Sequence, residues 1–194
     1  MSAFTGSNIN QREFAELSAE NLLSSLDVWD QVPEEHKRDT PGRLIKSLRQ
    51  MTEKEDFTFT SFLIDPEDPI DEMITLGPIP FYTLCVHHVL PFFGEAWISY
   101  IPTDRIAGLS KFARVVKWCA KGLWVQETLT QAIAKIIDDE LKPLGVGVVL
   151  KAEHLCMAMR GVEVAGVRTT TSTMKGVFAD HNRTAKAEFL AMIK

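Results

Sequence analysis

Cysteine and histidine residues at short spacings are the part of this sequence best suited to chemistry. Residues 84–88 read LCVHH, in which Cys85 and His88 stand three apart, so that one turn can present a thiolate and an imidazole to the same ion. Much later in the chain, His154 and Cys156 stand two apart in a segment with strand-like alternation, which predicts that both point to one face. If the sheet brings these segments together, Cys85, His88 and Cys156 form a soft nitrogen and sulfur donor set suited to zinc.

The number of ligands decides what such a site can do. Structural zinc sites are usually closed by four protein ligands, whereas three ligands leave a position open for water, whose pKa the ion lowers towards ~7. His87 and His154 would then be histidines beside the ion that pass protons near neutral pH, which is the composition of a hydrolytic site. For the Cys-x-x-His spacing alone, a buried thiol with a hydrogen-bonded histidine is the alternative. The third cysteine, Cys119, lies mid-helix among apolar residues, where we expect a small buried side chain rather than a fourth ligand.

Positive charge gathers at the start of a predicted helix, where residues 108–114 read GLSKFAR. Ser110 stands at an N-cap or first-turn position, and Lys111 and Arg114 lie three apart on one side of the helix, so an anion would be stable there. A triphosphate requires several cations. The sequence offers two more, Arg160 and Arg43. Solvated cations on an amphipathic helix are the alternative.

An amide and a carboxylate, Gln126 and Glu127, open the next helical segment. A carboxylate can accept hydrogen bonds from N1–H and the 2-amino group of a guanine-type base at once. The alternative is that Glu127 only complements the positive end of its helix.

Composition describes an ordinary soluble globular protein. The chain has 194 residues, 21 Lys and Arg against 26 Asp and Glu, a formal charge of −5, and 45% apolar residues. These values argue against a polybasic nucleic-acid binder and against extended disorder. The sequence has neither a stretch near the ~20 apolar residues of a membrane span nor a signal-peptide pattern, and three widely spaced cysteines do not suggest a disulfide framework. We therefore expect a cytoplasmic protein with no membrane or nucleic-acid partner.

The elements that must position these residues form an α+β layout. Residues 1–60 are expected to be an N-terminal helical region, with helices over 10–26 and from Thr40, where Thr-Pro is typical of an N-cap followed by a first-turn proline. Prolines, a glycine and acidic residues between Glu53 and Pro80 predict turns and short strands. In the second region, 61–194, periodicity predicts strands ending near 102 and over 145–156 and 167–174, helices over 109–123 and 125–141, and a terminal helix from about Arg183. This order predicts an antiparallel sheet with helices on one face.

The motifs, taken together, resemble those of the GTP cyclohydrolase I family in order and spacing. They are CVHH at 85–88, GLSK with Arg114 at 108–114, VQE with LTQ at 125–131, and HLCM with MRG at 154–161. The resemblance extends from about Thr40 to the C-terminus and includes the threonine-rich segment near 170.

The resemblance implies a tunnelling fold, in which a four-stranded antiparallel sheet backed by two helices closes into an oligomeric barrel, typically a homodecamer of two pentamers with active sites at subunit interfaces. It implies zinc-dependent hydrolytic opening of the GTP imidazole ring at C8, release of formate, and closure to 7,8-dihydroneopterin triphosphate, the first step of a pterin, folate or deazapurine pathway. By position, Cys85, His88 and Cys156 would hold zinc, and His87 and His154 would transfer protons. Gln126 and Glu127 would bind guanine, and the triphosphate would be bound by Ser110, which also lies near the ribose, and by Lys111, Arg114 and Arg160.

Two positions depart from the family pattern. Val86 stands where glutamate is common, and residues 121–124 (KGLW) replace a more basic, proline-containing stretch. Neither change removes a presumed ligand or histidine, so the sequence predicts a working catalyst with an altered rate or pH profile. The alternatives are a catalytically degenerate zinc protein that still binds a purine nucleotide, and a structural zinc module whose oligomer is its function.

Overall fold

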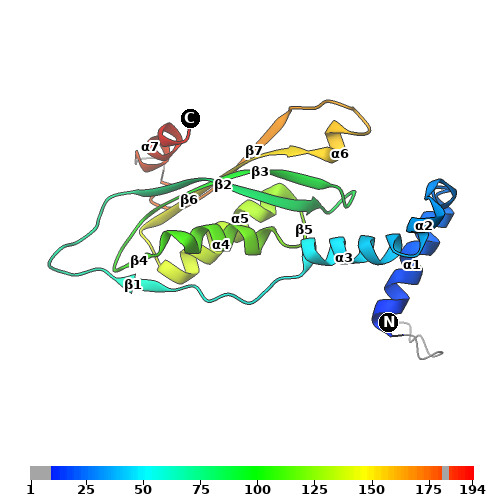
Figure 1. Ribbon diagram of the computed structural model, residues 1–194. Coiled ribbons are helices and arrows are strands. Elements are labelled where there is room, and N and C mark those ends of the chain that lie inside the picture. Colours follow the sequence, from blue (N-terminus) through cyan, green and yellow to red (C-terminus); the bar gives the residue numbers. More distant parts are fainter. Residues whose placement is uncertain (1–9, 181–183) are drawn as a thin grey trace, which may run out of the picture. The chain divides into compact units, whose positions relative to one another are not determined.

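The computed structural model describes residues 10–180 and 184–194 (Figure 1). The chain divides into two compact units, Met1–Thr52 and Glu53–Lys194, and each is described by itself. Among the described residues, none of the helices has the length and apolar character needed to cross a membrane. Arg183, from which the terminal helix was expected, lies outside the described residues.

The N-terminal unit is helical, and its last helix ends at Thr52. It contains α1 (Gln11–Ser25), η1 (Trp29–Gln31), α2 (Glu34–Lys37) and α3 (Thr40–Thr52). A capping box opens α1, because the Asn10 side chain accepts from the Glu13 N–H while the Glu13 side chain accepts from the Asn10 N–H. The expected N-cap at Thr40 is wrong: Thr40 is already helical, and its hydroxyl donates to the carbonyl of His36.

The second unit is a mixed α+β structure built on an antiparallel-rich sheet (Figure 1). Its elements are β1 (Ser61–Leu63), β2 (Ile74–Cys85), β3 (Pro91–Ile101), β4 (Arg105–Ala107), α4 (Leu109–Ala120), β5 (Leu123–Trp124), α5 (Gln126–Leu141), β6 (Gly145–His154), α6 (Leu155–Ala158), β7 (Arg168–Gly176) and α7 (Ala185–Met192). The strand order is β5-β2-β3-β6-β7, and the four long strands pair antiparallel with one another. The short strands β1 and β4 form a separate antiparallel pair.

The core lies between this sheet and the helices α4 and α5, as expected for a sheet backed by two helices (Figure 1). The sheet has five strands and not four, because the short parallel strand β5 joins the four antiparallel ones. Alternate residues of β6 face the helices, as period-two spacing requires. They are Val146, Val148, Leu150 and Ala152, all fully buried. In α5 the buried residues recur at helical spacing, at Leu129, Ile133, Ile137 and Leu141. Burying each such side chain stabilises the fold by roughly 1.5–3 kcal/mol.

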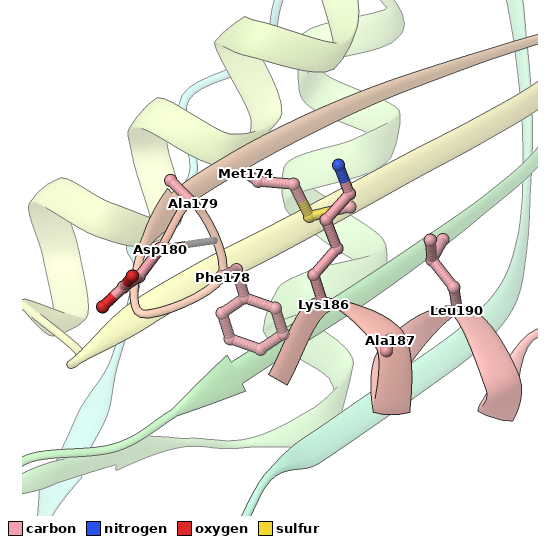
Figure 2. A pocket seen from close by; sticks show the side chains of 7 residues that line it. All are labelled: Met174, Phe178, Ala179, Asp180, Lys186, Ala187 and Leu190. Carbon is pink, nitrogen blue, oxygen red and sulfur yellow. The ribbon is translucent and has the colours of Figure 1, made fainter. Parts of the chain in front are cut away.

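The opposite face of the sheet carries a smaller cluster, in which Val149 of β6 packs with Phe178, Phe189 and Ile193. Helix α7 covers this part of the sheet, and a cavity of about 490 Å³ lies between it and the end of β7 (Figure 2). The end of β7 pairs with Gly145, at the start of β6. Gly145 and His154 are the two ends of β6, nine residues apart at about 3.3 Å each. The cavity is therefore about 30 Å from the end of the sheet that carries His154.

Two elements differ from the sequence prediction. Strand β2 runs through Gly77, Pro78 and Pro80, where short strands and turns were expected. Its register with β3 shifts between Leu76 and Ile79, and β5 pairs with only its last two residues, so most of β2 is an edge strand, where proline is tolerated.

The helix predicted over 109–123 ends at Ala120 instead. Leu123 and Trp124 form β5, which pairs in parallel with Leu84 and Cys85 at the end of β2. This pairing brings the start of α5 next to the end of β2.

Candidate metal centre and active site

Cys85, His88 and Cys156 come together at one end of the sheet. Their ligand atoms, two thiol sulfurs and one imidazole nitrogen, all lie within 4.8 Å of one another. Cys85 is the last residue of β2, and the turn after it is closed by two hydrogen bonds of 2.8 Å, from the Cys85 N–H to the Leu90 carbonyl and from the Val89 N–H to the Cys85 carbonyl. This turn carries His88 back over Cys85.

Cys156 reaches the cluster by a different route from the one predicted. The strand was expected to continue to Cys156, which would have put His154 and Cys156 on one face. In the structure β6 ends at His154, and Cys156 lies in the first turn of α6. The prediction of a shared strand is therefore wrong, although the predicted cluster forms.

The cluster has the chemistry and spacing of a metal site. In a tetrahedral zinc site with bonds of about 2.0–2.3 Å, the ligand atoms are about 3.5–3.8 Å apart, so three atoms within 4.8 Å need to close by only about 1 Å. Burial and the neighbouring Cys85 thiol raise the pKa of Cys156, an effect that Arg160 partly offsets. A divalent cation held between the two sulfurs would stabilise them as thiolates.

His87 lies next to the cluster, with its Nδ1 3.6 Å from the Cys85 sulfur. The turn that carries His87 is hydrogen-bonded to β5 and has an unusual backbone conformation at Val89. The Val86 N–H donates to the Trp124 carbonyl of β5 at 3.1 Å, and Val89 has a φ of 55°, which β-branched residues rarely adopt. His87 and Val86 are both exposed. An exposed imidazole beside the ligand set can exchange protons with a bound molecule.

His154, the last residue of β6, is oriented by two neighbours. Its ring stacks on Phe92 of β3, with centroids 4.4 Å apart and planes 7° apart. Its Nε2 lies 2.8 Å from Oε1 of Gln126, the first residue of α5. Burial lowers the pKa of His154, and the charge of Glu127 partly restores it. The neutral imidazole is therefore favoured.

Gln126 occupies a different environment from the one that its sequence position predicts. Its side chain is 2% exposed. Its Nε2 has two protons to donate among three acceptors: the carbonyl oxygens of Leu150 and Thr169, at 3.3 and 3.0 Å, and the Thr171 hydroxyl at 3.1 Å. Both ends of the amide are thus used inside the chain, whereas the neighbouring Glu127 is exposed.

Three of the predicted phosphate-binding residues, Ser110, Lys111 and Arg114, lie on α4. Lys111 donates from Nζ to the Thr58 carbonyl at 3.2 Å. Arg114 lines a cavity of about 440 Å³ between α4 and the segment before β1, together with Glu55, Asp56, Lys117 and Lys121.

Arg160 lies just beyond α6 and acts electrostatically on Cys156. Arg43 belongs to the N-terminal unit, where it is paired with Asp39 at 2.9 Å.

Comparison with known proteins gives a consistent result. The sequence pattern that defines GTP cyclohydrolase I matches residues 16–194. The chain is 44% identical over 167 residues to GTP cyclohydrolase 1 of Hydrogenobaculum sp., covering 86% of this chain and 90% of that one. It is also similar to the enzymes of that name from Chlorobium phaeovibrioides (42% identity; 94% and 82% covered) and Aquifex aeolicus (43%; 81% and 84%).

The chain belongs to the GTP cyclohydrolase I family. Among solved structures, the chain is similar to the archaeosine synthase QueF-Like in its apo form. The alignment covers 56% of this chain and 96% of the synthase chain, at 16% identity and a TM-score of 0.42.

In this GTP cyclohydrolase I family member, the expected site residues of the second unit fall into two groups. The first group contains the three possible metal ligands and the residues near them. Its members are Cys85, His87, His88, Gln126, Glu127, His154, Cys156 and Arg160. The second group, Ser110 with Lys111 and Arg114, lies on α4, whose far end leads into β5 beside Cys85. From Ser110 to Ala120, at the cluster end of α4, there are ten residues of about 1.5 Å rise, or about 15 Å.

Three residues around the first group had no signal in the sequence. Phe92, Thr169 and Thr171 matter only because β3 and β7 flank β6, which puts Phe92 directly opposite His154 and Thr169 opposite Ala152. Strand pairing of this kind depends on long-range contacts that a local pattern does not specify.

Proposed function

We propose that this chain catalyses hydrolytic opening of the GTP imidazole ring at C8, with release of formate and closure to 7,8-dihydroneopterin triphosphate, and that its metal is zinc. The observation that carries the proposal is the convergence of Cys85, His88 and Cys156 within 4.8 Å, with His87 3.6 Å from Cys85. Three ligands with proton-carrying side chains beside them are typical of a catalytic rather than a structural zinc site. The family membership of the chain supports the choice of GTP.

The reaction makes demands that the residues around the cluster can meet. C8 is bonded to N7 and N9, and its loss as formate requires both bonds to be hydrolysed, each cleavage consuming one water and leaving a nitrogen that takes up a proton. Closure onto the rearranged sugar releases one water, so the net reaction consumes one. Zinc held by Cys85, His88 and Cys156 would supply a Lewis acid that lowers the pKa of water at the site. His87 and His154 would hold and deliver the protons.

Recognition of the base falls to Glu127 in this proposal. Its carboxylate is exposed at the start of α5, one residue from the buried Gln126. A carboxylate there can accept from N1–H and the 2-amino group of guanine together, which adenine cannot satisfy. Arg160, exposed beside Cys156, supplies positive charge for the phosphates on the same side.

A second copy of the chain completes the site in this proposal. Ser110 is about 15 Å from the cluster end of its own α4, so Ser110, Lys111 and Arg114 would bind the triphosphate of GTP held at the cluster of another subunit. Exposed apolar side chains around the cluster support an interface there. They are Val86, Val89, Met159, Val162 and Val164. Among residues 10–180 and 184–194, no strand pairs with the outer edge of β7, which could extend the sheet into the proposed barrel, for which we expect a decamer of two pentamers.

The test of the activity is turnover of GTP by the purified, zinc-loaded protein, with formate and an oxidised fluorescent pterin measured together. We expect both products, and we expect His87→Ala to abolish them while His36→Ala, an exposed histidine of the N-terminal unit, leaves them unchanged. GTP binding without either product would favour a degenerate nucleotide-binding protein. Val86→Glu, which restores the residue common in the family, would then be the variant to assay.

Shared sites can be tested by subunit complementation. Cys156→Ser removes a metal ligand, and Lys111→Ala removes a phosphate-binding residue, so each variant alone should be inactive. If the two residues act on one substrate from different chains, dissociating and reassembling the mixture should recover part of the activity. No recovery in mixed oligomers would place both residues in one chain's site and contradict the proposal.

A further inference from the structure

We propose that Gln126 is a positioning residue that fixes the orientation of the His154 ring and its tautomer, with the proton on Nε2 and not on Nδ1. The functional part of this inference rests on the proposed function, because it assigns a role in that reaction. It also differs from the assignment of the Gln126 amide to the guanine base.

The partners of the Gln126 amide determine which way it points. Its Nε2 lies 3.0 Å from the Thr169 carbonyl oxygen and 3.3 Å from that of Leu150. Carbonyl oxygens only accept hydrogen bonds, so the nitrogen end of the amide must face them. The flipped amide would put three oxygens together in a buried place, which is strongly unfavourable.

A closed circuit of hydroxyl groups gives the same orientation. Thr130 Oγ1 donates to the Gln126 main-chain carbonyl at 2.7 Å, so its proton is used there. The 2.7 Å contact between Thr130 and Thr171 must then use the Thr171 proton, which leaves Thr171 Oγ1 to accept from Gln126 Nε2 at 3.1 Å. The two hydroxyl protons of this circuit therefore each have one position consistent with that amide orientation.

The orientation of the amide decides the tautomer of His154. With Nε2 of Gln126 facing β6 and β7, its Oε1 faces His154 at 2.8 Å. An amide oxygen cannot donate, so His154 Nε2 must carry the proton. The other ring nitrogen, Nδ1, is then unprotonated in the neutral imidazole. Stacking on Phe92 fixes the plane of the ring, so its orientation and its tautomer are both determined.

A purely structural role and a role in reading the base make different predictions. If Gln126 only tied α5 to β6 and β7, its loss would lower stability and leave the His154 tautomer unchanged. If its amide bound guanine, its loss would raise KM for GTP. A positioning role predicts instead a lower kcat with little change in KM, because the proton acceptor is misaligned after the substrate has bound.

The first measurement uses the wild-type protein. Nitrogen NMR of 15N-histidine-labelled, zinc-loaded protein near neutral pH, with the His154 signals identified by their loss in His154→Gln, should show a protonated Nε2 and an unprotonated Nδ1. The opposite tautomer would overturn the proposal. Because this readout needs no turnover, it stands or falls separately from the proposed GTP reaction.

The second measurement compares two variants. Gln126→Met keeps the length of the side chain but removes the oxygen that faces His154, and it should mix the two tautomers and lower kcat on the order of 10²-fold. Thr171→Val is the matched control, because it breaks the hydroxyl circuit but leaves the 2.8 Å contact, and it should keep the tautomer and nearly all of kcat. An unchanged tautomer in folded Gln126→Met, or a raised KM with normal kcat, would contradict the proposal. If Gln126→Met does not fold, the wild-type spectrum still decides.

Discussion

Cys119 tests how many protein ligands the metal centre has, because it is the one cysteine outside the cluster. It is 1% exposed in the core, and burial raises its pKa from an ordinary 9.0 to about 12. Because the folded pKa is the higher one, the stability associated with the neutral thiol is complete below about pH 9 and is lost as the pH rises towards 12. Between pH 8 and pH 10 the free energy of unfolding should fall by about 1.4 kcal/mol on this account.

Replacing Cys119 with alanine removes the titrating group, so the variant should lack this loss. Urea unfolding of both zinc-loaded proteins at pH 8 and pH 10, at equal protein concentration, should show the stability of the wild type relative to the variant falling by about 1.4 kcal/mol. All other titrating groups are shared and cancel. A difference that stays constant would mean that the folded protein ionises this thiol normally, and loss of zinc from Cys119→Ala would make Cys119 a ligand and the site closed.

Three further predictions concern the ligands, the base and the core. Cys156→Ser should bind less than one zinc per chain after dialysis against a weak chelator, and full occupancy would contradict its role as a ligand. Glu127→Gln should weaken GTP binding roughly tenfold to a hundredfold in calorimetry, since a charge-assisted hydrogen bond is lost, and an unchanged Kd would exclude base recognition by Glu127. Ile137→Ala, at a fully buried position, should lower the free energy of unfolding by about 2–5 kcal/mol, whereas Leu109→Ala, at a position 68% exposed, should change it by less than about 0.5 kcal/mol; equal effects would refute the described core.

Local periodicity was sufficient to predict the parts of the fold with one buried face. Val146, Val148, Leu150 and Ala152 alternate in the sequence and line the core in the structure. Their spacing carries the signal because a strand with one buried face repeats every two residues. Helix α5, whose buried residues repeat every three or four positions, was predictable for the same reason.

Elements determined by long-range pairing were not predictable in this way. The prolines of β2 indicated turns, but an edge strand needs fewer N–H donors and tolerates them. Leu123 continues the apolar pattern of the predicted helix, but in the structure it belongs to β5 and pairs with β2.

In the candidate site too, some features were predictable from the local sequence and others depended on long-range packing. The types and spacing of Cys85, His88 and Cys156 indicated their convergence, since few residue types bind zinc. The surroundings of Gln126 were not readable, because its partners Leu150, Thr169 and Thr171 come from strands far away in the sequence. A polar residue at the start of a helix is normally exposed, and only the packing of α5 against β6 and β7 buries this one.

The most direct test of the central claim is the stoichiometry of products from GTP with the zinc-loaded wild-type protein. Ring opening followed by closure predicts one formate and one pterin triphosphate for each GTP consumed, at one zinc per chain. Formate without a pterin would mean that the ring opens but the product does not close. Neither product, at full zinc occupancy, would contradict the assignment of Cys85, His88 and Cys156 to a hydrolytic centre.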